Sequence, residues 1–383
     1  MSAWPIVPAA NCVFFALGRN AMYAACLAVG VGPGDEVLTP AFDCAGALQP
    51  FRVLGCRLRF VRSDPSTFAI DVDDLRRRLT PQTKLVHIIN HFGMPQPWEE
   101  LLALRAATGV PILEDNAYSL FSSHRGRPFG TFGDLAIFSL RKELPLPQGG
   151  LLRVNNLAYA AAVRETSRRA TGSTGRNAMQ LVKSGLGYQK LPMEWRWWLR
   201  RRLPMNDPPP PLPSDPAAGV PAWPLRDAIG PEFSCDYLRP ISRWARTQLS
   251  RLTLQDYQAI ADLKRQLYAS LVRSLASVDG IRVLWPELPD GIVPWGVSVL
   301  VNAGRDEMLE RLRGRYPVMA WPTLPQAVID QLDDFPDVEW LGRRLLQLPL
   351  SADAVRLPGF GRYARGFVDD VRRLVTPTLV PVG

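Results

Sequence analysis

Polar residues at the ends of two apolar segments have the types and spacing for amine chemistry. The run Ile112–Asp115 ends in two acids, and an aspartate at a strand end can pair with a cationic heterocycle. The run Phe138–Lys142 includes a serine and ends in a lysine, and a glycine pair follows at 149–150. A lysine in an apolar cleft loses its proton readily and can form a Schiff base, whereas arginine cannot. Lys142 and Asp115 are therefore the candidate catalytic residues.

A third segment, Gly18–Ala21, opens a predicted helix whose first backbone N–H groups and positive dipole end favour a phosphate. A helix start, a solvated strand end and a basic turn are each ordinary structural features. Their order along the chain is more informative: a phosphate cup, then a strand-end aspartate, then a strand-end serine and lysine. Together they predict a site for pyridoxal phosphate.

The composition indicates a folded, soluble protein. The chain has 383 residues, 47% of them hydrophobic and 21% charged, which is enough for a large core and about two domains. Basic residues exceed acidic ones by nine, but they are spread along the chain, so a solvated surface and no nucleic-acid partner are expected. Only five of the 45 basic residues are lysines, so a lysine between a serine and a glycine pair is conspicuous.

The cysteines and the apolar segments indicate the cellular compartment of the protein. The five cysteines are odd in number, widely spaced and form no Cys-x-x-Cys pair, which argues against a disulfide framework or a zinc site, and no metal is expected. Neither the N-terminal segment nor any later stretch has the apolar run of a signal peptide or a spanning helix. The expected location is the cytoplasm.

Short strands and helices alternate through the first 155 residues. Strands are predicted at 36–39, 58–62, 84–89, 111–114, 135–140 and 150–154, and helices at 21–29, 45–54, 72–79 and 98–108. This alternation predicts an α/β fold with a mostly parallel sheet, covered by helices on both faces, and a site at the carboxyl ends of the strands. Helices at 241–275, 306–313 and 367–374 and strands at 281–284 and 297–301 indicate a smaller α+β domain. We expect a large domain over 1–240 and a small C-terminal domain over 241–383.

An unusual insertion, at about 190–230, lies within the large domain. Residues 195–202 read WRWWLRRR, and 207–224 are rich in proline. Proline at this density indicates an extended connector. The tryptophan and arginine side chains suit either a contact between domains or subunits, or peripheral docking on an anionic membrane surface.

Several short motifs follow one another along the chain: Gly30–Pro40, Ile70–Asp71, His91–Pro95, Glu114–Ala117, Gly130–Ser139, Lys142 and Gly149–Gly150. In this order they resemble the DegT/DnrJ/EryC1/StrS sugar aminotransferases, which are fold type I pyridoxal phosphate enzymes. The resemblance covers about residues 18–155 and is thinner in the C-terminal third, where Leu348–Leu350 is similar to a late strand of the family. It implies the fold type I architecture, with a large cofactor-binding domain and a small α+β domain.

The resemblance implies roles for the residues that match. Lys142 would form the Schiff base with the cofactor and later shuttle the substrate proton. Asp115 would pair with the pyridine nitrogen, so that the ring acts as an electron sink. Ser139 and the backbone of Arg19 and Asn20 would hold the phosphate.

Further residues are expected around the cofactor. His91 would approach its edge, although a histidine buried at a strand end is an equal alternative. Gln189, in a Gly-Tyr-Gln turn, would reach the cofactor phosphate of a partner subunit, so a homodimer is expected. Phe42 and Cys44 lie where an aromatic residue often stacks on the ring, and Phe42 is the expected stacking residue. Tyr118 replaces a glutamine or histidine of the family.

One departure concerns the lysine itself. Lys142 follows Ser139 by three residues, whereas the family's lysine follows by five, but the interval from Lys142 to Gly149 matches the family. A two-residue deletion before the lysine explains both intervals. The other departures surround the substrate rather than the cofactor.

The expected function is transfer of an amino group from glutamate or another donor to a keto group of a sugar-like or secondary-metabolite acceptor. Two alternatives remain open. One is a dehydratase, eliminase or replacement enzyme that uses the same cofactor and fold. The other is a non-catalytic binding protein, against which the joint presence of lysine, aspartate and serine argues.

Overall fold

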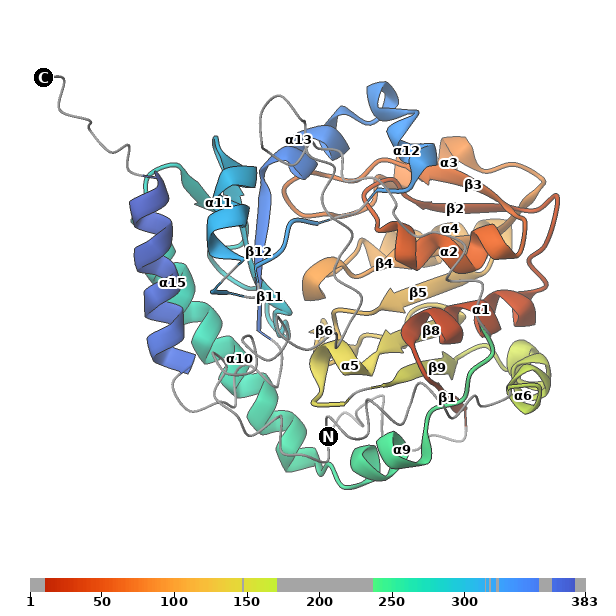
Figure 1. Ribbon diagram of the computed structural model, residues 1–383. Coiled ribbons are helices and arrows are strands. Elements are labelled where there is room, and N and C mark those ends of the chain that lie inside the picture. The colour runs from red at the N-terminus through yellow and green to blue at the C-terminus, as the bar shows by residue number, and fades with distance from the viewer. Residues whose placement is uncertain are drawn as a thin grey trace, which may run out of the picture.

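The computed structural model describes residues 11–170, 237–350 and 360–375, apart from residues 147, 314, 317, 322 and 323. A seven-stranded sheet forms the centre of its larger part, in the order β1-β9-β8-β5-β4-β2-β3 (Figure 1). The strands are β1 (Cys12–Phe15), β2 (Glu36–Pro40), β3 (Arg57–Val61), β4 (Thr83–Ile89), β5 (Ile112–Asn116), β8 (Leu135–Ser139) and β9 (Gly150–Val154). Neighbouring strands from β3 to β8 are parallel, and β9 is antiparallel to both β8 and β1. The prediction of an α/β fold with a mostly parallel sheet is confirmed.

Helices cover the sheet, and every residue of β2, β5 and β8 is therefore buried. The helices of this part are α1 (Gly18–Val29), α2 (Ala45–Val53), α3 (Val72–Arg78), α4 (Trp98–Thr108), α5 (Leu140–Glu143) and α6 (Ala160–Arg168), with 3-10 turns η1 (His91–Gly93) and η2 (Leu157–Tyr159). Helix α1 contacts α2 and α6. It ends at Gly30, and α4 ends at Gly109; both glycines adopt the left-handed conformation that stops a helix.

The C-terminal part is built around a three-stranded antiparallel sheet. Its strands are β10 (Ile281–Val283), β11 (Gly296–Val301) and β12 (Leu345–Pro349), and its helices are α11 (Arg305–Leu312), α12 (Gln326–Ile329), α13 (Pro336–Arg344) and α15 (Phe360–Val375), with the turn η5 (Leu332–Asp334). The other described elements are a hairpin of β6 (Ser123–His124) and β7 (Arg127–Pro128), helix α9 (Arg243–Ser250) and a long helix that joins the two parts. No described helix has the length and apolarity to cross a bilayer.

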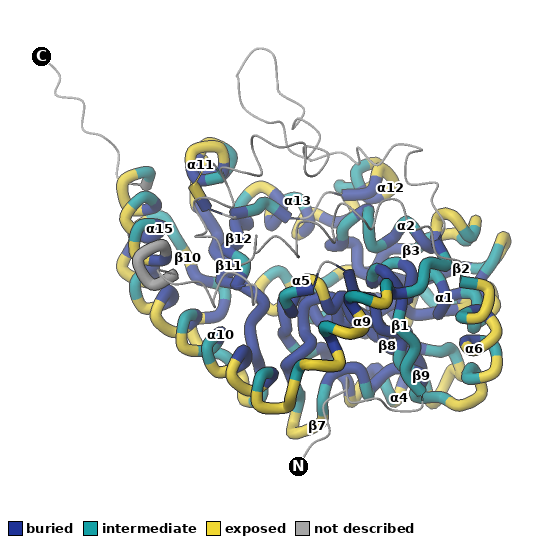
Figure 2. Tube along the Cα trace, turned by 60° about the horizontal axis from the view of Figure 1, so that its bottom comes forward, coloured by how far each residue is buried: buried dark blue, intermediate teal, exposed yellow. Residues whose placement is uncertain are grey.

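Helix α10 (Leu254–Leu275) joins the two parts. Its first half, through Tyr257 and Ile260, belongs to a cluster with Leu140 at the edge of the large sheet. Its second half, through Tyr268 and Leu271, belongs to the core of the small sheet and packs beside α15. The tube view shows this helix with a buried inner face and an exposed outer face (Figure 2). One helix therefore contributes to both cores.

Candidate active site

The five parallel strands of the large sheet end at one edge, and residues at the ends of β5 and β8 meet the start of α1 there. A cavity of about 210 Å³ lies there. Its lining includes four of the predicted residues, Arg19, Asp115, Ser139 and Lys142, together with Leu17, Gly18, Met22, Cys44, Gly46, Ala47, Ala117, Ile137 and Arg141. This is the location expected from the parallel topology, because the carboxyl ends of parallel strands meet at one edge.

Lys142 reaches the cavity from α5, a single turn that begins directly after Ser139, the last residue of β8. Its Nζ lies 3.6 Å from the centre of the Tyr118 ring. Loss of solvent on burial lowers the pKa of Lys142, although Cys44 and Asp115 act in the opposite direction. An amine with a lowered pKa is more often neutral near pH 7 and is therefore a better nucleophile. The short interval from Ser139 to Lys142 is thus sufficient to place the amine in the cavity.

Asp115 is buried at the end of β5 and is held on both oxygens. Oδ1 accepts a hydrogen bond from the N–H of Ala117 at 2.7 Å, and Oδ2 lies 3.4 Å from Nε2 of His87. Nδ1 of His87 in turn lies 3.0 Å from Oγ1 of Thr39. His87 was not among the residues predicted from the sequence, although it is a histidine inside the apolar strand that pairs with the Asp115 strand.

The neighbouring acid, Glu114, serves the opposite face of β5. Its carboxylate accepts hydrogen bonds from the N–H groups of Gly130, Phe132 and Gly133 at 2.6, 2.9 and 3.1 Å, and from the Asn90 side chain at 3.1 Å. Adjacent residues of a strand point to opposite faces, so only one of the paired acids reaches the cavity. Glu114 therefore organises the 130–133 loop, and Asp115 faces the site.

The opposite end of the cavity is suited to an anion. The start of α1 and Ser139 approach closely, because a Cβ on Gly18 would lie 3.2 Å from Cβ of Ser139. Arg19 and Arg141 both line the cavity, and Arg141 is otherwise exposed. Two guanidinium groups, a hydroxyl and a helix N-terminus are typical partners of a phosphate. Arg141 was not among the cofactor-binding residues predicted from the sequence.

Asn20 caps the helix instead of lining the cavity. Its Oδ1 accepts a hydrogen bond from the Leu17 N–H at 3.0 Å, and its side-chain amide donates to the carbonyl of Tyr237 at 2.9 Å. The Asn20 N–H donates to the carbonyl of Leu17. The structure therefore directs both the side chain and the N–H of Asn20 to protein groups, which differs from the expected phosphate contact.

The glycine pair holds the start of α1 against the sheet. A Cβ on Gly150 would lie 2.0 Å from the carbonyl oxygen of Leu17, and the N–H of Gly149 donates to the carbonyl of Ala16 at 2.8 Å. The close backbone approach expected of these glycines is therefore made to the residues just before α1. This contact fixes the helix N-terminus at the edge of the cavity.

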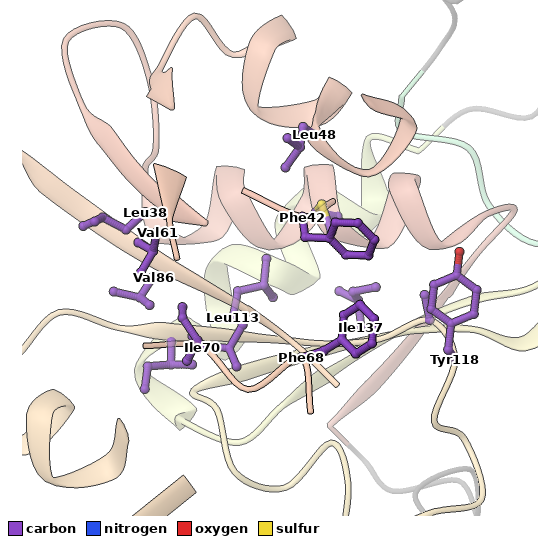
Figure 3. Close-up of a cluster of buried hydrophobic side chains, with 14 of the residues drawn as sticks. Leu38, Phe42, Leu48, Val61, Phe68, Ile70, Val86, Leu113, Tyr118 and Ile137 are labelled. Atoms are coloured by element: carbon purple, nitrogen blue, oxygen red, sulfur yellow. The ribbon is translucent and has the colours of Figure 1, made fainter. Parts of the chain in front are cut away.

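Phe42 and His91 lie in an aromatic cluster and not in the lining of the cavity. The Phe42 ring is 5.2 Å from that of Phe68 and 5.0 Å from that of Trp321, and Figure 3 shows Phe42 and Phe68 among the apolar side chains of the sheet. Nε2 of His91 donates to the Phe42 carbonyl at 2.9 Å, and burial lowers the pKa of His91 to about 4. From the same turn, Cys44 lines the cavity in place of Phe42. Tyr118 links the cluster to Lys142, because its ring also contacts Trp295 and Trp321.

Two other predictions fall outside the described residues: the contact made by Gln189 and the structure of the insertion at about 190–230. No group of three or more histidine, cysteine or acidic side chains with the arrangement of a metal site occurs among the residues that are described.

Comparison with known proteins shows which family the first half of the chain resembles. The model of the DegT/DnrJ/EryC1/StrS aminotransferase family matches residues 6–191. Over this part, which is just under half of the chain, the sequence is similar to that family. The matched residues include all of those that line the cavity.

Curated relatives are sugar aminotransferases by name. The dTDP-4-dehydro-2,3,6-trideoxy-D-glucose 4-aminotransferase of Saccharopolyspora spinosa is 28% identical over 88% of this chain and 79% of its own length. The UDP-2-acetamido-2-deoxy-3-oxo-D-glucuronate aminotransferase of Pseudomonas aeruginosa is 31% identical over 42% of this chain. That match spans 46% of the Pseudomonas protein, less than half of its length.

Solved structures share the fold. The aminotransferase TlmJ of Streptoalloteichus hindustanus matches 95% of this chain and 85% of its own with a TM-score of 0.69 at 22% identity. DesV of S. venezuelae, solved in complex with a ketimine intermediate, matches 95% of this chain and 85% of its own with a TM-score of 0.65 at 20% identity. At these identities the likeness shows that this chain and the two proteins share a fold.

Proposed function

We propose that the chain is a pyridoxal phosphate-dependent aminotransferase that delivers an amino group to a keto group on a sugar-like or secondary-metabolite acceptor. The convergence of Lys142, Asp115 and an anion-binding end in one cavity carries this proposal. The names of the relatives support a nucleotide-linked keto sugar as the acceptor. A cytoplasmic homodimer, completed by Gln189 of each subunit, is part of the same proposal.

The side chains present fit each part of the cofactor. The anion-binding end suits its phosphate, the Asp115 carboxylate suits a protonated pyridine nitrogen, and the Lys142 amine suits its aldehyde. Cys44 and Ala117, which also line the cavity, have small side chains that take up little of its volume. When bound, the cofactor would supply an electron sink for the carbon that carries the transferred amine.

The chain's own residues then have distinct tasks. Nζ of Lys142, with its lowered pKa, accepts the proton from the carbon that bears the amine. It donates that proton again later in the amino transfer. Asp115, fixed by the Ala117 N–H and by His87, keeps a negative charge at the pyridine nitrogen. Tyr118 and the aromatic cluster behind it exclude water from the Lys142 amine.

Titration with pyridoxal phosphate followed by half-reactions with a panel of amino donors tests the function. The purified protein should develop the visible absorbance of a lysine-bound cofactor, and one or more donors alone should convert it to the amine form of the cofactor. Lys142→Ala should abolish both changes. If the cofactor binds but no donor converts it, the eliminase alternative is favoured; if the wild type gains no absorbance, the proposal is wrong.

A further inference from the structure

A buried ion pair lies directly beneath the lysine turn. Nζ of Lys264, on α10, contacts Oε2 of Glu143, the last residue of α5, and the side chains are 0% and 1% exposed. The ring of Phe121 covers the ammonium group at 5.5 Å. Among the described residues, the other carboxylate oxygen of Glu143 has no hydrogen-bond partner. Lys264 is therefore the principal partner of a carboxylate that has lost its solvent.

A gain in the free energy of folding does not explain why a buried ion pair occupies this position. Removing two charges from water costs several kcal/mol per ion, and apolar replacements of buried pairs are often neutral or stabilising. A buried pair is directional, however, since it is favourable at one relative placement of its two helices. Its effect is therefore to fix that placement.

Helix α5 is an element that needs such fixing. It has four residues, a length at which a helix does not hold itself together in water. Leu140 and Glu143 are its buried residues and anchor it, while Arg141 and Lys142 line the cavity. The chain leaves the helix in an extended conformation at Leu144. The direction of the Lys142 side chain therefore depends on what holds the inner face of this turn.

We propose that the Glu143–Lys264 ion pair is a positioning device for Lys142, which ties the turn that carries the reactive amine to the helix that joins the two cores. The inference rests on the proposed function, because it assigns these residues a role toward the same amine. Lys264 lies between the part of α10 that packs on the large sheet and the part that packs on the small one. A displacement of α10 would thus be transmitted to Lys142.

The decisive variant is Glu143→Met/Lys264→Met, which removes both charges at once, leaves no buried polar group unpaired and leaves the net charge unchanged. It should fold with a thermal midpoint close to that of the wild type. Trapping of pyridoxal phosphate on Lys142 by borohydride, measured by peptide mass spectrometry, should become about 100-fold slower, the effect of a displacement of about 1 Å. The pH of half-maximal trapping should rise by about one unit, because the displaced amine regains solvent.

Lys264→Met alone leaves an unpaired buried carboxylate and should show the same two changes with a lower thermal midpoint. The matched control is Arg305→Met, which removes a buried paired cation of the small part, remote from Lys142. It should lower the midpoint without altering the trapping rate or its pH profile. If the neutral pair variant traps the cofactor at the wild-type rate and pH, the pair has no positioning role. If the wild type traps none on Lys142, the proposed function fails instead.

Discussion

Nε2 of His87, on β4, lies 3.4 Å from Oδ2 of Asp115, on the adjacent strand β5, and both side chains are buried. The imidazole is itself held by Thr39 through its other nitrogen. A buried aspartate without such a partner would have several rotamers and a high desolvation cost. The contact therefore fixes the direction in which Asp115 presents its charge to the cavity.

His87→Asn should weaken pyridoxal phosphate binding about tenfold, the effect expected when a hydrogen bond to a charged group is lost. Fluorescence titration of the apoprotein measures this affinity. His124→Asn is the control, because His124 lies near Glu99 and away from the cavity. Equal affinities of the wild type and His87→Asn would show that Asp115 does not need this contact.

Loss of charge should affect turnover at Asp115 and stability at Glu114, the two adjacent acids of β5. Asp115→Asn should lower turnover by about 100-fold or more, since it removes the charge opposite the pyridine nitrogen, with little change in the free energy of unfolding. Glu114→Gln should lower the free energy of unfolding by about 2 kcal/mol, because its carboxylate accepts several buried N–H bonds. Urea unfolding and steady-state rates separate these effects, and a stability loss in Asp115→Asn equal to that of Glu114→Gln would contradict the division of roles.

Arg141→Gln should lower the affinity for the phosphorylated cofactor but not for its unphosphorylated form. Binding of pyridoxal phosphate should weaken about tenfold, while binding of pyridoxal should stay the same, because Arg141 lies at the anion-binding end. Isothermal titration with both compounds measures the difference. Arg168→Gln, an exposed position on α6, is the matched control. A similar loss of affinity for both compounds would show that Arg141 does not bind the phosphate.

The buried His91 should make the protein sensitive to acid. Its pKa of about 4 lies below that of an unfolded histidine, near 6.5, so the unfolded state binds a proton first as the pH falls. The free energy of unfolding should therefore decrease between about pH 6.5 and pH 4, by about 3 kcal/mol. Urea unfolding at several pH values should show a shallower decrease for His91→Gln, and identical decreases would exclude His91 as the source.

Gly150→Ala should prevent the start of α1 from seating on β9. The added methyl group would meet the backbone carbonyl of Leu17, which cannot turn aside, and the expected loss is about 3 kcal/mol or more. Gly32→Ala is the control, since no atom lies within 4 Å of its added Cβ. Thermal unfolding of both proteins measures the effect, and a Gly150→Ala midpoint equal to that of the control would show that the segment adjusts without cost.

Much of the sheet and part of the site could be predicted from the sequence because both depend on local patterns. Apolar runs of strand length, interrupted by helical periodicity, located strands such as β4 and β9 within one residue. Strand ends then located Asp115, Ser139 and Lys142, since parallel topology brings such ends together.

The remainder depends on tertiary contacts that leave no local pattern. The helix turn α5 is too short for periodicity, and β1 becomes a strand by pairing with β9 far along the chain. Whether Phe42 or Cys44 faces the cavity depends on the direction of a side chain after the end of β2. The Glu143–Lys264 contact joins residues 121 positions apart, and neither one alone signals the other.

The pairing of β1 with β9 also bears on the order of folding. The side chain of Asn11 donates to the carbonyl of Val154, 143 positions later, and the start of α1 lies against Gly150. The anion-binding end is therefore completed only after a ribosome has synthesised the whole of the large parallel sheet. Contacts of such long sequence separation form slowly, and an early apolar segment that awaits its partner strand is exposed to aggregation. Production of this protein should accordingly depend on chaperones and on growth temperature more than its final core would suggest.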